Sequence, residues 1–167
     1  MKKNRSNPFS FFRSGSGPAI VLDKLGDNGA SCGWIKVSVP KDLRIYKKFS
    51  NCLHYLIKNH YVDFKKEKGT EVTLLPKGKI VYSRTKVLRS SLLPENRFCL
   101  VVFDIPENKR RLRELLRAFL DECGFIPLQK SVWISQFNAT KELSEFFEFL
   151  GLEEYIRVFT VINDNCP

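Results

Sequence analysis

Hydrophobic and polar positions follow a regular order in the second half of the chain. Residues 98–103 form an unbroken apolar run of β-forming residues, which predicts a strand with two apolar faces. Alternation along this strand would place Phe98, Leu100 and Val102 on one face, and Cys99, Val101 and Phe103 on the other. From Asn108 the apolar period changes to about four, which predicts an amphipathic helix that ends at Gly124.

The pattern after Gly124 completes a small α+β domain. Residues 125–136 predict a β-hairpin, residues 140–150 a helix, and residues 155–162 a closing strand. The order βαββαβ is that of a ferredoxin-like domain. Because two helices cover only one face of such a sheet, we expect the face with Phe98, Leu100 and Val102 to be buried by a second copy in a homodimer.

The first half has a different pattern. Residues 18–25 predict a short helix, and residues 41–59 predict a longer amphipathic helix. Residues 62–65 and 71–75 then alternate as two strands around a turn at residues 67–70. The stretch up to Pro40 fits either a strand or a degenerate second helix, and Trp34 within it is expected in the core. A helix followed by a basic hairpin is the order of a winged helix.

The polar face of the longer helix and the hairpin carry the candidate DNA-binding residues. The helix contributes Lys47, Lys48, Asn51, His54 and Lys58, and the hairpin contributes Lys65, Lys66 and Lys68. These residue types suit phosphate oxygens and base edges. The alternative is that they form a merely solvated basic surface.

The chain is therefore predicted to be an α+β protein, with an N-terminal winged helix-turn-helix followed by a ferredoxin-like βαββαβ domain. We expect a mobile basic arm over residues 1–17 and a winged-helix DNA-binding domain over residues 18–90. A linker would cover residues 91–97, and a ferredoxin-like dimerisation domain residues 98–167.

Charge separates the two halves as well. Residues 1–97 hold 20 Lys and Arg against 7 acidic residues, a net charge of +13, whereas residues 98–167 hold 8 against 11, a net charge of −3. Together they give the net charge of +10 for the whole chain. A polyanion such as double-stranded DNA is the expected partner of the basic half.

Five cysteines are spaced widely and include no CxxC pair, so neither a disulfide framework nor a zinc site is predicted. Cys99 and Cys123 lie in apolar patterns and are expected in the core. The N-terminus lacks an apolar segment of signal length, and no window reaches the length of a membrane span. These features predict a cytoplasmic protein that does not associate with a membrane.

Several short motifs carry a family resemblance. FDIPE, RxxLR, GF and LQxSVW follow one another between residues 98 and 162, and LLPKGK closes the predicted hairpin. The first four, in this order, resemble the middle region of the PaaX-like transcriptional repressors and, more distantly, the small CRISPR-associated adaptation proteins. LLPKGK resembles the end of many winged helix-turn-helix domains. The first resemblance implies a dimeric transcriptional regulator that needs no cofactor.

The second resemblance draws attention to Asp104, at the end of the first strand of the predicted ferredoxin-like domain. Two such carboxylates at a dimer axis would hold Mg²⁺ and activate water against a phosphodiester. This makes Asp104 a candidate catalytic residue and metal ligand of a nuclease. The structural alternative is that Asp104 accepts hydrogen bonds from the amides of residues 105–108. A non-catalytic scaffold that holds nucleic acid for a partner protein is a third hypothesis.

Overall fold

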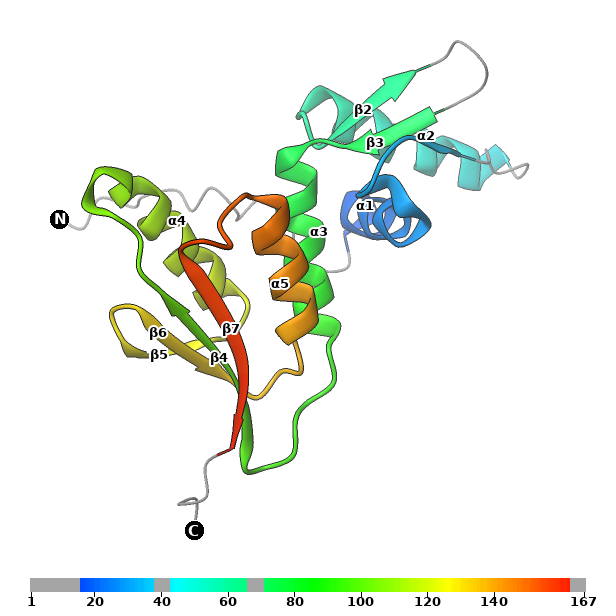
Figure 1. The fold of residues 1–167 in the computed structure, drawn as a ribbon. Coiled ribbons are helices and arrows are strands. Elements are labelled where there is room, and N and C mark those ends of the chain that lie inside the picture. Colours follow the sequence, from blue (N-terminus) through cyan, green and yellow to red (C-terminus); the bar gives the residue numbers. More distant parts are fainter. Residues whose placement is uncertain (1–15, 38–42, 66–70, 163–167) are drawn as a thin grey trace, which may run out of the picture. The chain divides into compact units, whose positions relative to one another are not determined.

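The computed structural model describes residues 16–37, 43–65 and 71–162, and it divides into two compact units (Figure 1). The N-terminal unit comprises residues 1–82 and the C-terminal unit residues 83–167. The boundary lies inside helix α3 (Pro76–Arg89), which the sequence analysis did not predict.

The N-terminal unit alternates helices with short strands. Its described elements are α1 (Gly17–Leu25), a π-helical turn (Gly26–Ala30), β1 (Ile35–Lys36), α2 (Leu43–Lys58), β2 (Val62–Lys65) and β3 (Glu71–Leu74). Ser16 caps α1, since its hydroxyl accepts a hydrogen bond from the amide of Ala19 at 3.4 Å. Gly29 has a φ of 96°, which lets the chain turn back after the π-helical turn.

Three antiparallel strands in the order β1-β3-β2 form the sheet of this unit. Its core is built from fully buried side chains of α1, α2 and the sheet, including Leu22, Leu56 and Val72. The start of α3 passes very close to this core, because a Cβ atom on Gly78 would lie 2.1 Å from the carbonyl oxygen of Tyr61. Only glycine fits at that position without a backbone shift.

The C-terminal unit has the element order expected from the sequence. Its elements are β4 (Arg97–Phe103), a 3₁₀ turn (Glu107–Lys109), α4 (Arg110–Glu122), β5 (Ile126–Gln129), β6 (Val132–Ser135), α5 (Thr140–Phe149) and β7 (Ile156–Ile162). The strands pair antiparallel in the order β5-β6-β4-β7. This order, with both helices as crossover connections, is the ferredoxin-like arrangement.

The two faces of β4 are buried to different extents. Cys99, Val101 and Phe103 are buried, whereas the alternating residues Phe98, Leu100 and Val102 are only partly buried. The helices contribute buried aromatic residues to the closed face, and Phe119 of α4 stacks on Phe146 of α5 with 4.5 Å between ring centroids. One face of the sheet is therefore packed and the other is open, as the sequence predicted.

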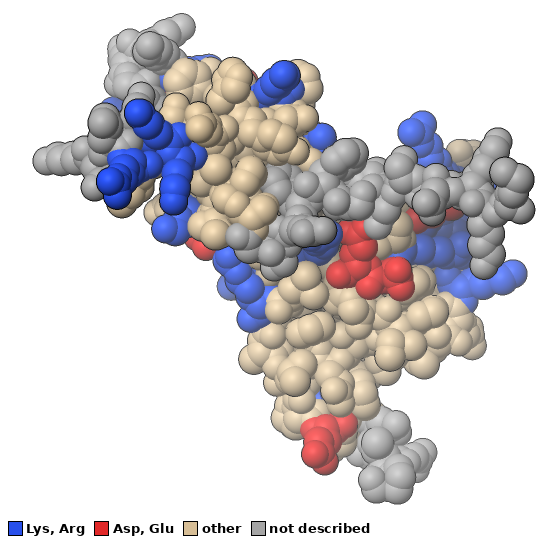
Figure 2. All heavy atoms as spheres, turned by 180° about the vertical axis from the view of Figure 1, so that it is seen from behind, with Lys and Arg blue, Asp and Glu red and all other residues tan. Residues whose placement is uncertain are grey.

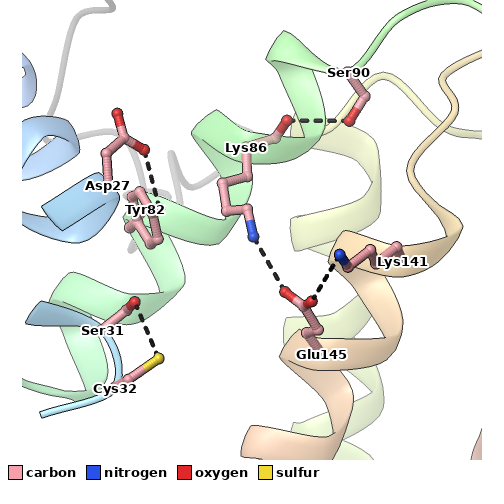
Figure 3. A network of polar contacts seen from close by, with 8 residues as sticks. All are labelled: Asp27, Ser31, Cys32, Tyr82, Lys86, Ser90, Lys141 and Glu145. Carbon is pink, nitrogen blue, oxygen red and sulfur yellow. Dashed lines mark hydrogen bonds and ion pairs between the residues drawn. The ribbon is translucent and has the colours of Figure 1, made fainter. Parts of the chain in front are cut away.

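The second half of α3 packs against the helices of the C-terminal unit. Arg84 pairs with Glu122 of α4 at 2.8 Å, and Lys86 pairs with Glu145 of α5 at 3.1 Å. Glu145 also lies 4.0 Å from Lys141, which forms the small network in Figure 3. In the N-terminal unit, the hydroxyl of Tyr82 lies 3.0 Å from an oxygen of Asp27 (Figure 3).

These contacts correct the predicted domain boundary. The expected linker at residues 91–97 is held within the C-terminal unit by backbone hydrogen bonds, from Leu93 to Gln136 and from Asn138 to Ser91, both at 2.7 Å. The division of the chain into two units falls within α3 instead, between Tyr82 and Ser83. None of the helices in the described part of the chain is long and apolar enough to cross a membrane.

Candidate nucleic-acid interface

Helix α2 is amphipathic, and its inner face fixes its orientation in the N-terminal unit. Leu53 and Leu56 are buried, and Phe49 packs against the same core. This packing turns the opposite face toward solvent. The five helix residues predicted to bind DNA are all exposed: Lys47, Lys48, Asn51, His54 and Lys58.

The same outer face contains two residues that the sequence analysis did not include among the binding residues. Arg44 and Tyr55 are exposed, and the spacing of Arg44, Lys47, Asn51, Tyr55 and Lys58 by three or four residues places them along one side of the helix. Tyr55 is 38% exposed, a high value for an aromatic side chain. This spacing was available in the sequence and would have identified both residues.

The charge on this face is not compensated within α2. The helix has no acidic residue, and the described contacts give Lys47, Lys48 and Lys58 no ion pair or hydrogen bond. Residues 1–82 hold 16 Lys and Arg against 6 acidic residues, so this unit carries a net charge of +10, the net charge of the whole chain. Figure 2 shows Lys and Arg side chains gathered on the visible face of the N-terminal unit, at the upper left.

The sheet of the N-terminal unit adds one lysine of the predicted hairpin to the described interface. Lys65 ends β2 and is exposed, whereas Lys66 and Lys68 lie outside the described residues. The ammonium group of Lys65 lies 4.1 Å from the ring centroid of Trp34. Trp34 was expected in the core, and this expectation is wrong, since its side chain is 38% exposed. Trp34 precedes a strand of only two residues, too short to carry it into the core.

The helix pair of a helix-turn-helix is not seen in the described part of this unit. Between β1 and β2 the described residues contain one helix, α2, and residues 38–42 are not described. The ambiguous stretch before Pro40 contributes the strand β1, which pairs with β3. The element order is thus consistent with a winged helix without establishing it.

The open face of the C-terminal sheet carries the predicted dimerisation residues. Phe98, Leu100 and Val102 alternate with buried residues on β4. Residues paired across neighbouring strands share a face, so Leu100 extends the apolar surface to Ile134 on β6 and Phe159 on β7. Ile126 pairs with Ile134 and is 65% exposed, and Phe159 is 47% exposed. One side of this sheet therefore presents a continuous apolar surface across all four strands.

Asp104 follows β4 and is exposed. Its amide donates a hydrogen bond to the carbonyl oxygen of Tyr155 at 2.9 Å. Its carboxylate accepts no hydrogen bond within the described structure, so the expected bonds from the amides of residues 105–108 are not formed. The described residues also contain no group of three His, Cys, Asp or Glu side chains that would hold a metal ion.

Two of the four arginines of α4 pair with neighbouring carboxylates. Arg110 pairs with Glu114 at 3.3 Å, and Arg113 pairs with Glu107 at 2.7 Å. The hydrogen bond and charge of Arg113 lower the pKa of the Glu107 carboxyl. Arg117 donates instead to the backbone carbonyl of Lys130 at 3.0 Å. The α4 surface therefore offers less free positive charge to a nucleic acid than its four arginines suggest.

Comparison with known families identifies the C-terminal unit. Residues 94–165 match the family model of the PaaX protein central Cas2-like domain. Residues 94–165 of the chain are thus similar to this PaaX-family domain. The match spans β4 to β7 and confirms the resemblance that the FDIPE and LQxSVW motifs indicated. Among curated proteins, none matches the chain.

Proposed function

We propose that this chain is a dimeric DNA-binding regulator of PaaX-like type, most simply a repressor. The observation that carries this proposal is the uncompensated basic face of α2. An unpaired, exposed lysine forms no stabilising contact within its own protein. When it binds a DNA phosphate, a counterion condensed on the DNA is released, which favours binding. A helix with several such lysines and no carboxylate is therefore suited to bind a polyanion.

In this proposal the N-terminal unit is a winged helix-turn-helix. Helix α2, with 16 residues and a length of about 24 Å, is the recognition helix in the major groove. Lys47, Lys48 and Lys58 contact phosphates, and Asn51 and His54 reach base edges. Lys65, with Lys66 and Lys68 of the same hairpin, contacts the adjacent backbone as the wing.

The C-terminal unit supplies the second part of the proposal. Its open sheet face is large and apolar, and such surfaces on small domains are usually covered by a partner. A two-fold dimer would place Phe98, Leu100 and Val102 of one copy against the same residues of the other. Two copies held in this way would present two recognition helices to two half-sites at a fixed spacing. The arrangement requires double-stranded DNA and a second copy, and it requires no cofactor.

Selection of bound sequences from a random duplex pool tests this function. A two-fold symmetric motif with half-sites separated by a whole number of helical turns is the expected result. Retention of duplexes without any enriched motif would contradict a sequence-specific regulator and favour a scaffold for a partner protein.

A further inference from the structure

The N-terminal unit contains a cavity whose lining includes Lys48, one of the proposed DNA-contacting residues. It lies between α1, β1 and α2 and has a volume of about 630 Å³. Binding sites for small molecules commonly have volumes in this range and are lined mainly by apolar side chains. Ile45 and Lys48 of α2 line the cavity, and both side chains are exposed.

Its walls leave large aliphatic side chains in contact with water. Ile20 of α1 is 47% exposed, Ile45 of α2 is 57% exposed, and both line the cavity together with Val21 and Phe49. Burying one such side chain fully contributes roughly 1.5–3 kcal/mol. An apolar molecule between α1 and α2 would therefore cover surface on both walls at once.

Positive charge surrounds the same cavity. Lys24 of α1, Lys36 of β1 and Lys48 of α2 line it and are exposed. Among the described residues that line it there is no acidic residue, and the described contacts give these three lysines no ion pair. Three lysines from three elements thus create a positive potential around an apolar interior, which favours an anionic head group on an apolar body.

We propose that this cavity binds a single-chain amphiphilic carboxylate, with its hydrocarbon chain between Ile20, Ile45 and Phe49 and its carboxylate near Lys24 and Lys48. Residues 1–15 are a less suitable occupant, because they contain four basic residues and no acidic residue to complement the lysines. Lys48 is also one of the proposed phosphate contacts. A bound carboxylate would compete with DNA for this ammonium group and lower the affinity of the duplex, a consequence that rests on the proposed DNA-binding function.

Three probes of equal chain length test the binding itself, in the full chain and without DNA. Octanoate, 1-octanol and octylammonium each contain eight carbon atoms, and their head groups are negative, neutral and positive, respectively. We expect octanoate to bind at least about tenfold more tightly than octanol, and octylammonium to bind most weakly, as measured by isothermal titration calorimetry. Equal affinities for the three probes, or no octanoate binding, would overturn the proposal.

Variants then locate the site. The double substitution Lys24→Ala and Lys48→Ala should reduce octanoate affinity to that of octanol. Lys130→Ala, an exposed lysine of the C-terminal unit, is the matched control and should leave it unchanged. Ile45→Glu places a carboxylate on an exposed wall position and should abolish octanoate binding without unfolding the protein. Unchanged affinity in both cavity variants would contradict the assignment.

Two further measurements separate the possible failures. Octanoate binding that appears only after residues 1–15 are removed would identify that segment as the occupant and overturn the ligand proposal. Octanoate binding without any duplex binding would support the cavity and reject the DNA-binding function. With both activities present, saturating octanoate should weaken duplex binding about tenfold, and this effect should disappear in Lys48→Ala.

Discussion

Two helices carry clusters of basic residues, and they differ in what surrounds the charge. Helix α2 has exposed lysines and no acidic residue, whereas two arginines of α4, Arg110 and Arg113, pair with Glu114 and Glu107. The same contrast extends to the two units, because residues 83–167 contain 12 basic and 12 acidic residues and residues 1–82 carry the net charge of +10. The number of basic residues on a helix is thus a weaker indicator of nucleic-acid binding than the absence of carboxylates beside them.

The two units also differ in the kind of surface that they expose to solvent. The C-terminal unit is electrically balanced but leaves an apolar sheet face open, whereas the N-terminal unit leaves positive charge exposed. An apolar face suits a protein partner, and free positive charge suits a polyanion. This difference supports the proposal that the N-terminal unit binds nucleic acid and the C-terminal unit forms the dimer.

The largest expected difference between the units is in the reactivity of their cysteines. Cys32 of the N-terminal unit is exposed, whereas Cys123 is fully buried against α4, and burial raises the pKa of the Cys123 thiol. A maleimide should modify Cys32 at least about 1000-fold faster than Cys123, because Cys123 reacts only after unfolding. The raised pKa also keeps the Cys123 thiol protonated to higher pH than an ordinary cysteine thiol. Site-resolved mass spectrometry measures both rates, and comparable rates would show that the C-terminal core is not closed.

The next effect tests the open sheet face. Leu100→Arg places a charge at its centre and should weaken self-association by about 100-fold, or ~3 kcal/mol, since the guanidinium would be buried without a partner. Leu115→Arg, at an exposed position of α4, is the matched control. Sedimentation equilibrium measures the dissociation constant of the dimer, which should rise in Leu100→Arg and stay unchanged in Leu115→Arg. A wild-type protein that stays monomeric at high micromolar concentration would remove the dimer from the proposal.

A smaller effect, on the free energy of unfolding, is expected from the ion pairs between α3 and the other helices of the C-terminal unit. Glu122→Gln leaves the guanidinium of Arg84 without its carboxylate in a site where the two side chains are 17% and 14% exposed. We expect a loss of about 2 kcal/mol in the free energy of unfolding, measured with urea. Glu145→Gln removes a carboxylate that is 50% exposed and should cost less than about 1 kcal/mol. Equal losses would indicate that burial does not set the strength of these pairs.

The smallest expected effect concerns Asp104. Asp104→Asn should change duplex affinity by less than about twofold and stability by less than about 0.5 kcal/mol, because its carboxylate is exposed and accepts no hydrogen bond in the described structure. The test incubates wild type and variant with Mg²⁺ or Mn²⁺ and with single-stranded and duplex substrates. Cleavage by the wild type that is absent from the variant would instead establish a metal-dependent nuclease.

The sequence predicted the C-terminal unit well because its signals are local and strong. The apolar run at residues 98–103, the period of α4 and the glycine at its end each define an element without knowledge of the rest of the fold. The two faces of β4 were also predictable, since alternation is a property of any strand. The face expected to be left open by the helices, with Phe98, Leu100 and Val102, is the less buried face of β4, although alternation alone does not distinguish two apolar faces.

The errors arose where tertiary contacts decide the structure. Helix α3 begins at Pro76, contains Gly78 and has weak amphipathic character, and its two halves pack against different cores. Trp34 is a large apolar residue of the kind often found in cores, but it directly precedes the two-residue strand β1. Its ring contacts the ammonium group of Lys65, which belongs to β2. The cavity between α1 and α2 likewise depends on the packing of three separate elements. None of these features has a signal within a short window of sequence.

The contrast between α2 and α4 is tested most directly by the salt dependence of duplex binding. The measurement compares the wild type with two triple variants, Lys47→Ala, Lys48→Ala and Lys58→Ala in α2, and Arg110→Ala, Arg111→Ala and Arg113→Ala in α4. We predict that the α2 variant lowers the slope of log affinity against log salt by about 3, one for each lost phosphate contact. The α4 variant should leave the slope within about 1 of the wild type. Equal changes in both variants, or an unchanged slope in the α2 variant, would contradict the assignment of α2 as the DNA-binding helix.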